Sequence, residues 1–479
     1  MACTTILVGR LASNDNSTII ARNDDCPSGQ FTEKKLIIKE KNTMGETYTS
    51  KISKVCVKLP KESLKYTLFP SVNDKSGLWP AAGINELNVG MSATETITSN
   101  PRVLGADPYV KLHIENDEEI PGGIGEEDLV ALVLPYIKSA REGVLRLGKL
   151  LEEYGTYEPN GIAFNDDKEV WWLETIGGHH FIARRVPDDR YVVMPNQFGL
   201  DNFDLEDAFG EQKENICSKD LKEFIKKFHL DLNQNGIFNP RLIFGSYSDS
   251  DHVYNTPRAW DIERNFNKLS FKWYGDNADY TPESDNLPWS LVPDHKLSVE
   301  DVKYALSLHF QGTEYDPYSK VASKPIYRTI GINRTSLLNM VQIRNGVEEN
   351  KKAILWFTFG SNVFNQIVPF MIHGNNVPSY YANTTLELDS NNFYWANRLI
   401  GALADAHYGS CLIHIERYQN ALANKAHELI NLVDFANYPL DDFNKEMADE
   451  AQKLTRDCLE KVLYTSSMNM KNAFQRSDN

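Results

Sequence analysis

The sequence has no hydrophobic run long enough to cross a membrane. In this chain of 479 residues, no apolar stretch approaches the ~18 residues that a membrane-spanning helix needs. The N-terminus also lacks the basic region and apolar core of a secretory signal peptide, and begins instead with a strand-like sequence. We therefore expect no membrane partner and a cytoplasmic location.

Positive charge and cysteine are also scarce. Lys and Arg number 50 against 66 Asp and Glu, which leaves a net charge of −16. Such an excess of negative charge argues against binding to nucleic acid or to an anionic membrane. The six cysteines are scattered without paired spacing and without a Cys-x-x-Cys motif, which predicts free thiols rather than disulfides or a zinc site.

The rest of the composition is that of an ordinary globular protein, with 41% hydrophobic and 24% charged residues. Strand-like runs at 161–164, 170–175, 180–186 and 190–194 follow a helical pattern at 126–154, which Pro135 should kink or split and Gly155 should end. Residues 391–435 and 440–475 are helical by pattern. Strand-rich blocks flanked by helices predict a layered α+β core, which we divide into residues 1–390 and a helical extension, 391–479, packed on it.

The most informative stretch is the first 25 residues. Residues 4–9 and 17–21 are rich in β-branched and apolar residues, and the polar segment 11–16 between them has turn chemistry. Folded as an antiparallel hairpin, they bring Cys3 opposite residues 22–26, beside Arg22 and Asp25. Charged neighbours of this kind can activate and orient a nucleophilic cysteine. The alternative is a buried, unreactive cysteine followed by a solvated loop.

This stretch resembles the opening of the bacterial dipeptidase A enzymes, which form with the secernins one family of N-terminal nucleophile (Ntn) cysteine peptidases. The matching phrases are CTTILVG at 3–9 and STIIARNDD at 17–25, followed in the family's order by GINE at 83–86, WLETIGGHH at 172–180, PNQF at 195–198 and YNTPR at 254–258. The resemblance spans most of the chain. It implies a four-layer αββα Ntn-hydrolase sandwich with helical insertions, and a dipeptidase that uses no metal or organic cofactor.

The resemblance also implies catalytic roles. Cys3 would be the nucleophile and, once it is the first residue, its α-amine would be the general base, because an α-amine titrates near ~8. Arg22 would favour the thiolate and Asp25 would orient the α-ammonium group. Asn196 would donate a hydrogen bond to the oxyanion.

Three further residues are predicted to bind substrate. Arg258 would organise the site and bind a carboxylate bidentately, with Arg264 as its competitor. The family places oxyanion or substrate contacts just past the strand at 89–93, where Thr94 and Glu95 are the nearest candidates. Asn85, in the GINE phrase, is the third predicted substrate-binding residue.

Other interpretations stay open. The same nucleophile could serve an amidase of the penicillin-acylase or bile-salt-hydrolase type, and a secernin-like protein could lack enzymatic activity. A conventional cysteine–histidine pair could instead use His113, His252, His309 or His373. The sequence leaves the dipeptide preference undecided and allows a homo-oligomer.

The adjacent pair His179 and His180 suggests a metal site at first sight. On a strand, however, neighbouring side chains point to opposite faces, so the two rings could not ligate one ion. We therefore expect a structural role for both.

Overall fold

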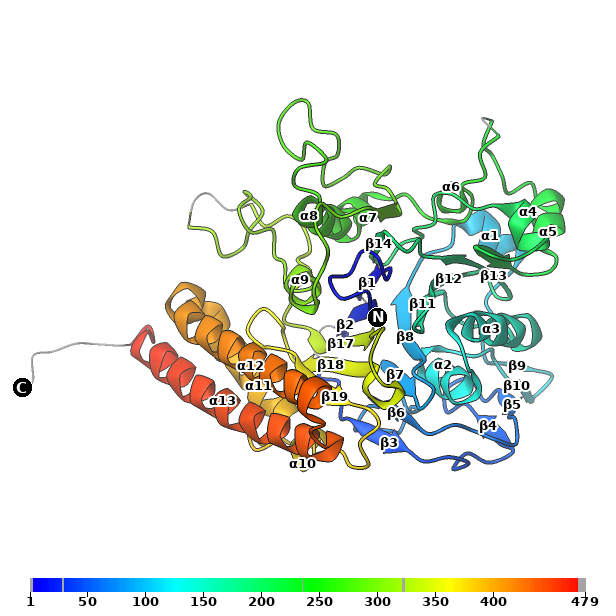
Figure 1. The fold of residues 1–479 in the computed structure, drawn as a ribbon. Helices are drawn as coiled ribbons and strands as arrows, with labels where there is room; N and C mark the ends of the chain where they lie inside the picture. The colour runs from blue at the N-terminus through cyan, green and yellow to red at the C-terminus, as the bar shows by residue number, and fades with distance from the viewer. Residues whose placement is uncertain (1–2, 28–29, 235, 321–323, 473–479) are drawn as a thin grey trace, which may run out of the picture.

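Two antiparallel sheets form the centre of the molecule in the computed structural model, which describes residues 3–27, 30–234, 236–320 and 324–472 (Figure 1). Within these residues the first sheet has seven strands in the order β16-β14-β1-β2-β17-β18-β19. Their bounds are β1 Thr4–Val8, β2 Thr18–Asp25, β14 Tyr191–Met194, β16 Ser290–Leu291, β17 Thr335–Ile343, β18 Ala353–Phe359 and β19 Val368–Met371.

The second sheet has eight described strands in the order β15-β13-β12-β11-β8-β7-β6-β3. Their bounds are β3 Ile37–Lys39, β6 Tyr66–Leu68, β7 Ala82–Asn85, β8 Gly90–Thr96, β11 Asn160–Asn165, β12 Val170–Ile176, β13 His180–Arg185 and β15 Asn215–Cys217. Two small hairpins lie outside both sheets, β4 Thr47–Thr49 with β5 Cys56–Lys58, and β9 His113–Glu115 with β10 Glu118–Ile120. The sheets face each other through contacts of β2 with β8, β11 and β12.

The predicted N-terminal hairpin is confirmed. β1 pairs antiparallel with β2 in a register that sets Thr4 opposite Asn23 and Thr5 opposite Arg22. Every residue of both strands is buried, because β2 lies in the middle of its sheet and faces the second sheet. Carrying the register one residue further sets Cys3 opposite Asp24.

The helical pattern at 126–154 is confirmed, together with its interruption. α2 Glu126–Val133 and α3 Ala140–Tyr154 are separated by the 3-10 turn Leu134–Tyr136, which contains Pro135. α3 ends at Gly155, whose φ of 67° suits glycine. α2 contacts β8, and α3 contacts β11, β12 and β13, so both helices cover the eight-stranded sheet.

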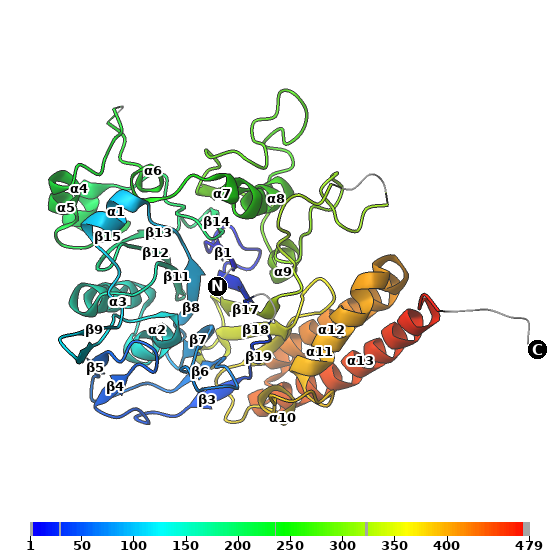
Figure 2. The same ribbon diagram turned by 180° about the vertical axis from the view of Figure 1, so that it is seen from behind.

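Three long helices cover the seven-stranded sheet near its β18–β19 edge (Figure 2). They are α11 Phe393–Ala404, α12 Tyr408–Ala436 and α13 Leu440–Met468. The helical pattern at 391–435 and 440–475 is confirmed in the described residues up to Met468, and the 3-10 turn Asp405–His407 separates α11 from α12. Leu422 of α12 and Phe443 of α13 belong to the same hydrophobic cluster as Ile20 and Phe357 of the sheet. The division of the chain into residues 1–390 and a helical extension, 391–479, stays a prediction.

Shorter helices fill the connections between strands. They are α1 Pro101–Ala106, α4 Leu205–Phe209, α5 Leu221–Lys227, α6 Pro240–Phe244, α7 Asp249–Tyr254, α8 Thr256–Phe266, α9 Val299–Ala305 and α10 Ser379–Ala382. The whole is an α+β fold, as the sequence predicts. Among the described residues, no helix is long and apolar enough to span a bilayer.

The expectation that His179 and His180 point apart is wrong. Nδ1 of His179 lies 2.8 Å from Oδ1 of Asp107, and Nδ1 of His180 lies 2.7 Å from Oδ2 of the same carboxylate. Strand alternation does not apply, because β13 begins only at His180 and His179 belongs to the preceding turn. The pair ties this turn to the end of α1, which is a structural role.

Candidate active site

Strand pairing brings the N-terminal cysteine between two sets of polar residues. β14 lies on the other side of β1 from β2, and Thr5 is opposite Met194. Two residues further along this antiparallel register, Asn196 comes opposite Cys3. The β1 strand therefore carries Cys3 with Asp24 on one flank and Asn196 on the other, although these residues are far apart in the chain.

Arg22 is held so that one N–H group points at the thiol. Its Nη1 lies 3.0 Å from Sγ of Cys3 and donates to the carbonyl of Thr94 at 2.6 Å. Nη2 donates to the carbonyls of Ala93 at 2.7 Å and Ala81 at 3.0 Å. Three backbone oxygens of the second sheet thus fix a buried guanidinium against the sulfur, a geometry that stabilises a thiolate.

Burial and charge act on the thiol in opposite directions. The side chain of Cys3 is fully buried, and burial raises the pKa of its thiol, while the charge of Arg22 lowers it. The carboxylates of Glu95 and Asp24 raise the thiol pKa further. The thiol is therefore protonated at neutral pH unless a base close by accepts its proton.

Asp24 and Lys34 belong to this site but were not predicted. Asp24 lies two residues after Arg22 on β2, so both point to the same face, and its carboxylate is 3.5 Å from Arg22 Nη2 and 3.5 Å from Lys34 Nζ. Burial alone would raise the pKa of Asp24, but Lys34 and Arg22 hold it below its usual value. Strand alternation could have identified Asp24, whereas no local signal points to Lys34.

All five N–H donors of Arg258 are occupied by protein acceptors. Nε donates to the carbonyl of Tyr254 at 2.7 Å. Nη1 donates to the carbonyl of Cys3 and, at 2.7 Å, to Oγ1 of Thr4. Nη2 donates to Oδ1 of Asn196 and to Oδ1 of Asn255, both at 2.8 Å. An arginine has five such donors, so this arrangement leaves none for a substrate carboxylate. Arg258 instead fixes Cys3 and Asn196 relative to each other.

Asn196 lies beside Cys3 with its amide oriented by neighbours. Oδ1 accepts from Arg258, and Nδ2 donates to the carbonyl of Thr96 at 2.9 Å. The backbone carbonyl of Asn196 accepts from Nδ2 of Asn255 at 3.1 Å. Asn255 was part of the recognised YNTPR phrase, but no role was predicted for it.

Asp25 contacts residues on the other side of β2 from Arg22. Its Oδ1 accepts from Oγ1 of Thr335 at 2.6 Å, and its Oδ2 pairs with Arg328. No hydrogen bond or ion pair joins its side chain to Cys3 in the described part of the chain, so its predicted role at the α-ammonium group stays a prediction. Arg328 and Thr335 come from the region before and at the start of β17, which sequence reasoning did not connect with the site.

Glu95 is the most unusual carboxyl near Cys3. It is fully buried, and Oε2 accepts from Oγ1 of Thr5 at 2.8 Å, while Oε1 has no hydrogen-bond partner among the described residues. Burial raises the pKa of Glu95 to about 8, because it outweighs the opposing charge of Arg258 and the bond from Thr5. The neighbouring Thr94 also has a buried hydroxyl without a described partner.

The predicted substrate residue Asn85 and the alternative Arg264 have contacts elsewhere. Asn85 donates from Nδ2 to the carbonyls of Leu134 at 3.0 Å and Ile137 at 2.8 Å, which ties the β7–β8 turn to the end of α2. Arg264, the competitor of Arg258, donates from Nε to Asp261 at 2.7 Å. These contacts are those of residues that hold the fold together.

The histidines of the competing mechanism have other partners. Their closest polar contacts in the described structure are His113 with the carbonyl of Lys111, His252 with Asp285, His309 with Asp316 and His373 with Asn88. None of these contacts involves Cys3. The described residues also contain no cluster of three or more His, Cys, Asp or Glu side chains suited to a metal ion.

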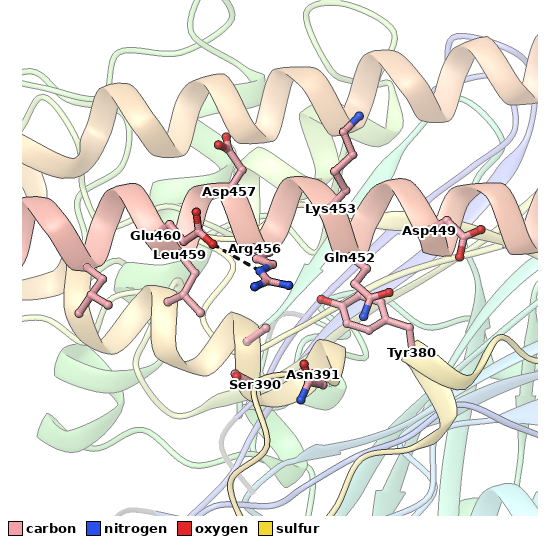
Figure 3. Close-up of a pocket in the computed structure, with 12 residues that line it drawn as sticks. Tyr380, Ser390, Asn391, Asp449, Gln452, Lys453, Arg456, Asp457, Leu459 and Glu460 are labelled. Atoms are coloured by element: carbon pink, nitrogen blue, oxygen red, sulfur yellow. Dashed lines mark hydrogen bonds and ion pairs between the residues drawn. The ribbon is translucent and has the colours of Figure 1, made fainter.

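A cavity of about 650 Å³ lies between α13 and the segment around Tyr380 and Asn391, away from Cys3 (Figure 3). Lys453, Arg456, Asp457 and Glu460 of α13 are among its lining residues. Arg456 pairs with Glu460 at 3.3 Å. None of the residues around Cys3 lines it, so it is not part of the candidate active site.

Comparison with known proteins identifies the family of this chain. The sequence model of peptidase family C69 matches residues 2–421, and the chain belongs to this family. Among its relatives, a protein of Bifidobacterium longum named dipeptidase is 48% identical, with both chains covered completely. A probable dipeptidase A of Streptococcus pyogenes is 47% identical over the whole of both chains, and dipeptidase A of Lactobacillus helveticus is 42% identical over 85% of this chain and 82% of its own.

Proposed function

We propose that this protein is a cysteine dipeptidase in which Cys3 is the nucleophile and becomes the first residue when Met1 and Ala2 are removed. The observation that carries the proposal is the 3.0 Å contact between Sγ of Cys3 and Nη1 of Arg22, directly before β1, where the register with β14 sets Asn196 opposite Cys3. The names of the relatives support dipeptides as the substrate class. Two facing sheets with helices on their outer faces support the four-layer αββα sandwich of Ntn hydrolases.

The first step is deprotonation of the thiol. The free α-amine of Cys3, with a pKa near ~8, takes the thiol proton directly or through one water. The guanidinium of Arg22 then stabilises the thiolate, which burial alone would disfavour. The thiolate attacks the peptide carbonyl carbon, a C–S bond forms, and the carbonyl electron pair moves to oxygen.

The second step uses Asn196. Its Nδ2 donates a hydrogen bond to the oxyanion of the tetrahedral intermediate. Arg258 donates to Oδ1 of Asn196 at 2.8 Å and also binds the carbonyl of Cys3. It thus holds the amide of Asn196 at a fixed position relative to Cys3. Arg258 is therefore a positioning residue in this mechanism.

The α-amine completes the cycle. As the C–N bond breaks, the α-ammonium group gives its proton to the leaving amine. It then takes a proton from the water that hydrolyses the acyl-enzyme, and the free thiol returns. Asp25 would accept a hydrogen bond from the α-ammonium group through a lone pair not used by Thr335 or Arg328.

Loss of Met1 and Ala2 is a requirement of this mechanism, since the nitrogen of a peptide bond cannot act as a base. Ala2 is small, and a small second residue permits removal of Met1 by a methionine aminopeptidase. The thiol of Cys3 can attack the preceding carbonyl in an N-to-S acyl shift, and intramolecular reactions of this kind benefit from high effective concentration. Hydrolysis of the resulting thioester releases Ala2.

Intact-mass analysis together with a hydrolysis assay tests the proposal. Wild-type protein should begin at Cys3 and cleave unblocked dipeptides in the presence of EDTA. Cys3→Ala should keep Ala2, retain its fold and show no turnover. The control Cys56→Ala changes an exposed thiol and should keep full activity.

Two results would count against the proposal. Fully active enzyme with Ala2 still attached would exclude the α-amine as base and favour a cysteine–histidine pair. Cleavage of bile-salt or penicillin amides at rates equal to those for dipeptides would favour the amidase interpretation.

A further inference from the structure

The cations around Cys3 differ in how many of their donors are used. Arg22 is occupied by the thiol and three carbonyls, and Arg258 has no donor left. Lys34 donates to Ser71 and Trp79 and is 3.5 Å from Asp24, and Arg328 is paired with Asp25. All four side chains are buried and held by protein groups, so a more exposed cation is the better candidate to bind a substrate carboxylate.

Tyr254 connects this group to one further arginine. Its ring centroid lies 5.2 Å from the guanidinium of Arg258 and 5.1 Å from that of Arg328. Its hydroxyl accepts a hydrogen bond from Nη2 of Arg334 at 2.7 Å. Although burial raises the pKa of Tyr254, the charge of Arg328 and the bond from Arg334 bring it below its ordinary value, so the surroundings of this phenol are strongly positive.

Arg334 stands just before β17, at the same end of the sheet as Cys3. Its backbone carbonyl accepts from the amide of Cys26 at 2.9 Å, and its side chain is half-buried. Within the described ranges, the guanidinium of Arg334 makes no hydrogen bond other than the one to Tyr254, and no carboxylate lies within 4 Å of it. In a chain with a net charge of −16, this leaves Arg334 as a cation with unused donors that is linked to Cys3 through Tyr254 and Arg258.

We propose that Arg334, positioned by the hydroxyl of Tyr254, binds the α-carboxylate of the substrate. This inference rests on the proposed dipeptidase function. A dipeptide carries its carboxylate on the residue directly after the scissile bond, so a dipeptidase can recognise it close to the nucleophile. A guanidinium suits this task because its planar N–H groups match the two oxygens of a carboxylate.

The test compares an unblocked dipeptide with its C-terminal amide. The dipeptide cleaved best among a panel of unblocked dipeptides and the amide of that same dipeptide are assayed with wild type, Arg334→Gln and Arg334→Lys. Arg334→Gln should lower kcat/KM on the free acid by about 10- to 100-fold, mainly through KM, because a charge-assisted hydrogen-bonded pair is lost. Its rate on the amide should change less than about 3-fold, and Arg334→Lys should restore part of the loss, since the charge remains without the planar fork.

Tyr254→Phe tests the positioning role. It removes the hydroxyl that accepts from Arg334 but keeps the ring that contacts Arg258 and Arg328, so KM for the free acid should rise while kcat stays the same. Arg146→Gln is the matched control, because Arg146 is also half-buried, donates one hydrogen bond, to the carbonyl of Leu132, and lies over a tyrosine ring. It should leave both substrates unaffected.

The possible failures are distinguishable. Arg334→Gln with wild-type kcat/KM on the free acid, or with equal losses on acid and amide, would overturn the assignment of Arg334 and leave the proposed function standing. Wild-type protein that cleaves no unblocked dipeptide would overturn the proposed function and this assignment together.

Discussion

Replacing Glu95 by Gln should stabilise the protein increasingly as the pH rises. The Glu95 carboxyl is fully buried, one of its oxygens accepts from Thr5 at 2.8 Å, and the other has no partner among the described residues. Gln has nearly the same shape and can still accept the hydrogen bond from Thr5. The substitution therefore removes the ionisable group while keeping the packing.

The sign and size of the effect follow from the pKa. Burial raises the pKa of Glu95 from 4.5 to about 8, so between these values the folded state binds more protons than the unfolded state. Stability is then lost as the pH rises from about 4.5 to about 8. This difference in pKa corresponds to a loss of roughly 5 kcal/mol in the free energy of unfolding as an upper limit, at ~1.4 kcal/mol for each pKa unit. Gln does not titrate, so the advantage of the variant should be small near pH 4.5 and largest above pH 8.

Urea unfolding of both proteins at pH 5, 7 and 9 measures this difference. The control Glu118→Gln changes an exposed carboxylate on β10 and should shift the midpoint equally at all three pH values. If wild type and Glu95→Gln keep a constant difference from pH 5 to pH 9, Glu95 titrates normally and the reasoning fails. Kinetics on the same variant test the predicted substrate role of Glu95, because loss of a contact with substrate would raise KM.

Two further variants address predicted site residues. Asn196→Ala should lower kcat by roughly 10²–10³ with a smaller effect on KM, as expected for an oxyanion donor, and steady-state kinetics showing an unchanged kcat would contradict this role. Asn85→Ala loses the hydrogen bonds that Nδ2 donates to Leu134 and Ile137 and those that Oδ1 accepts from the amides of Leu87 and Val89, and should destabilise the protein by about 1–3 kcal/mol in denaturant unfolding without changing KM. A raised KM would instead support its predicted contact with substrate.

The parts of the fold that depend on neighbouring residues could be predicted from the sequence. The β1–β2 hairpin follows from a short turn between two β-branched runs, and the break between α2 and α3 follows from Pro135. The placement of Asn196 could not be derived in this way. It depends on β14 leaving the strands that precede it in the chain and pairing with β1, and no local pattern specifies such long-range pairing.

Predictions were wrong where the alternation of side chains along a strand was applied to residues outside the strand. Alternation along a strand predicts that His179 and His180 point apart, yet both contact Asp107, which lies about seventy residues earlier in the chain. The same rule, applied to β2, would have identified Asp24 as a neighbour of Arg22 on one face. The rule holds inside a strand such as β2 and fails at the first residue of β13.

Arg22, Arg258 and Arg334 lie at the Cys3 end of the sheet and are alike in charge, but they differ in exposure and in the use of their hydrogen-bond donors. Arg22 directs one donor to the sulfur because three carbonyls hold the others, so its guanidinium cannot turn toward a substrate. Arg258 uses all five donors on protein acceptors and so fixes the distance between Cys3 and Asn196, the proposed nucleophile and oxyanion donor. Only Arg334 combines partial exposure with donors that no described group accepts. Since a guanidinium carries the same charge in each place, the hydrogen-bond count rather than the charge is the basis for the three proposed roles, which are thiolate stabilisation for Arg22, positioning for Arg258 and substrate binding for Arg334.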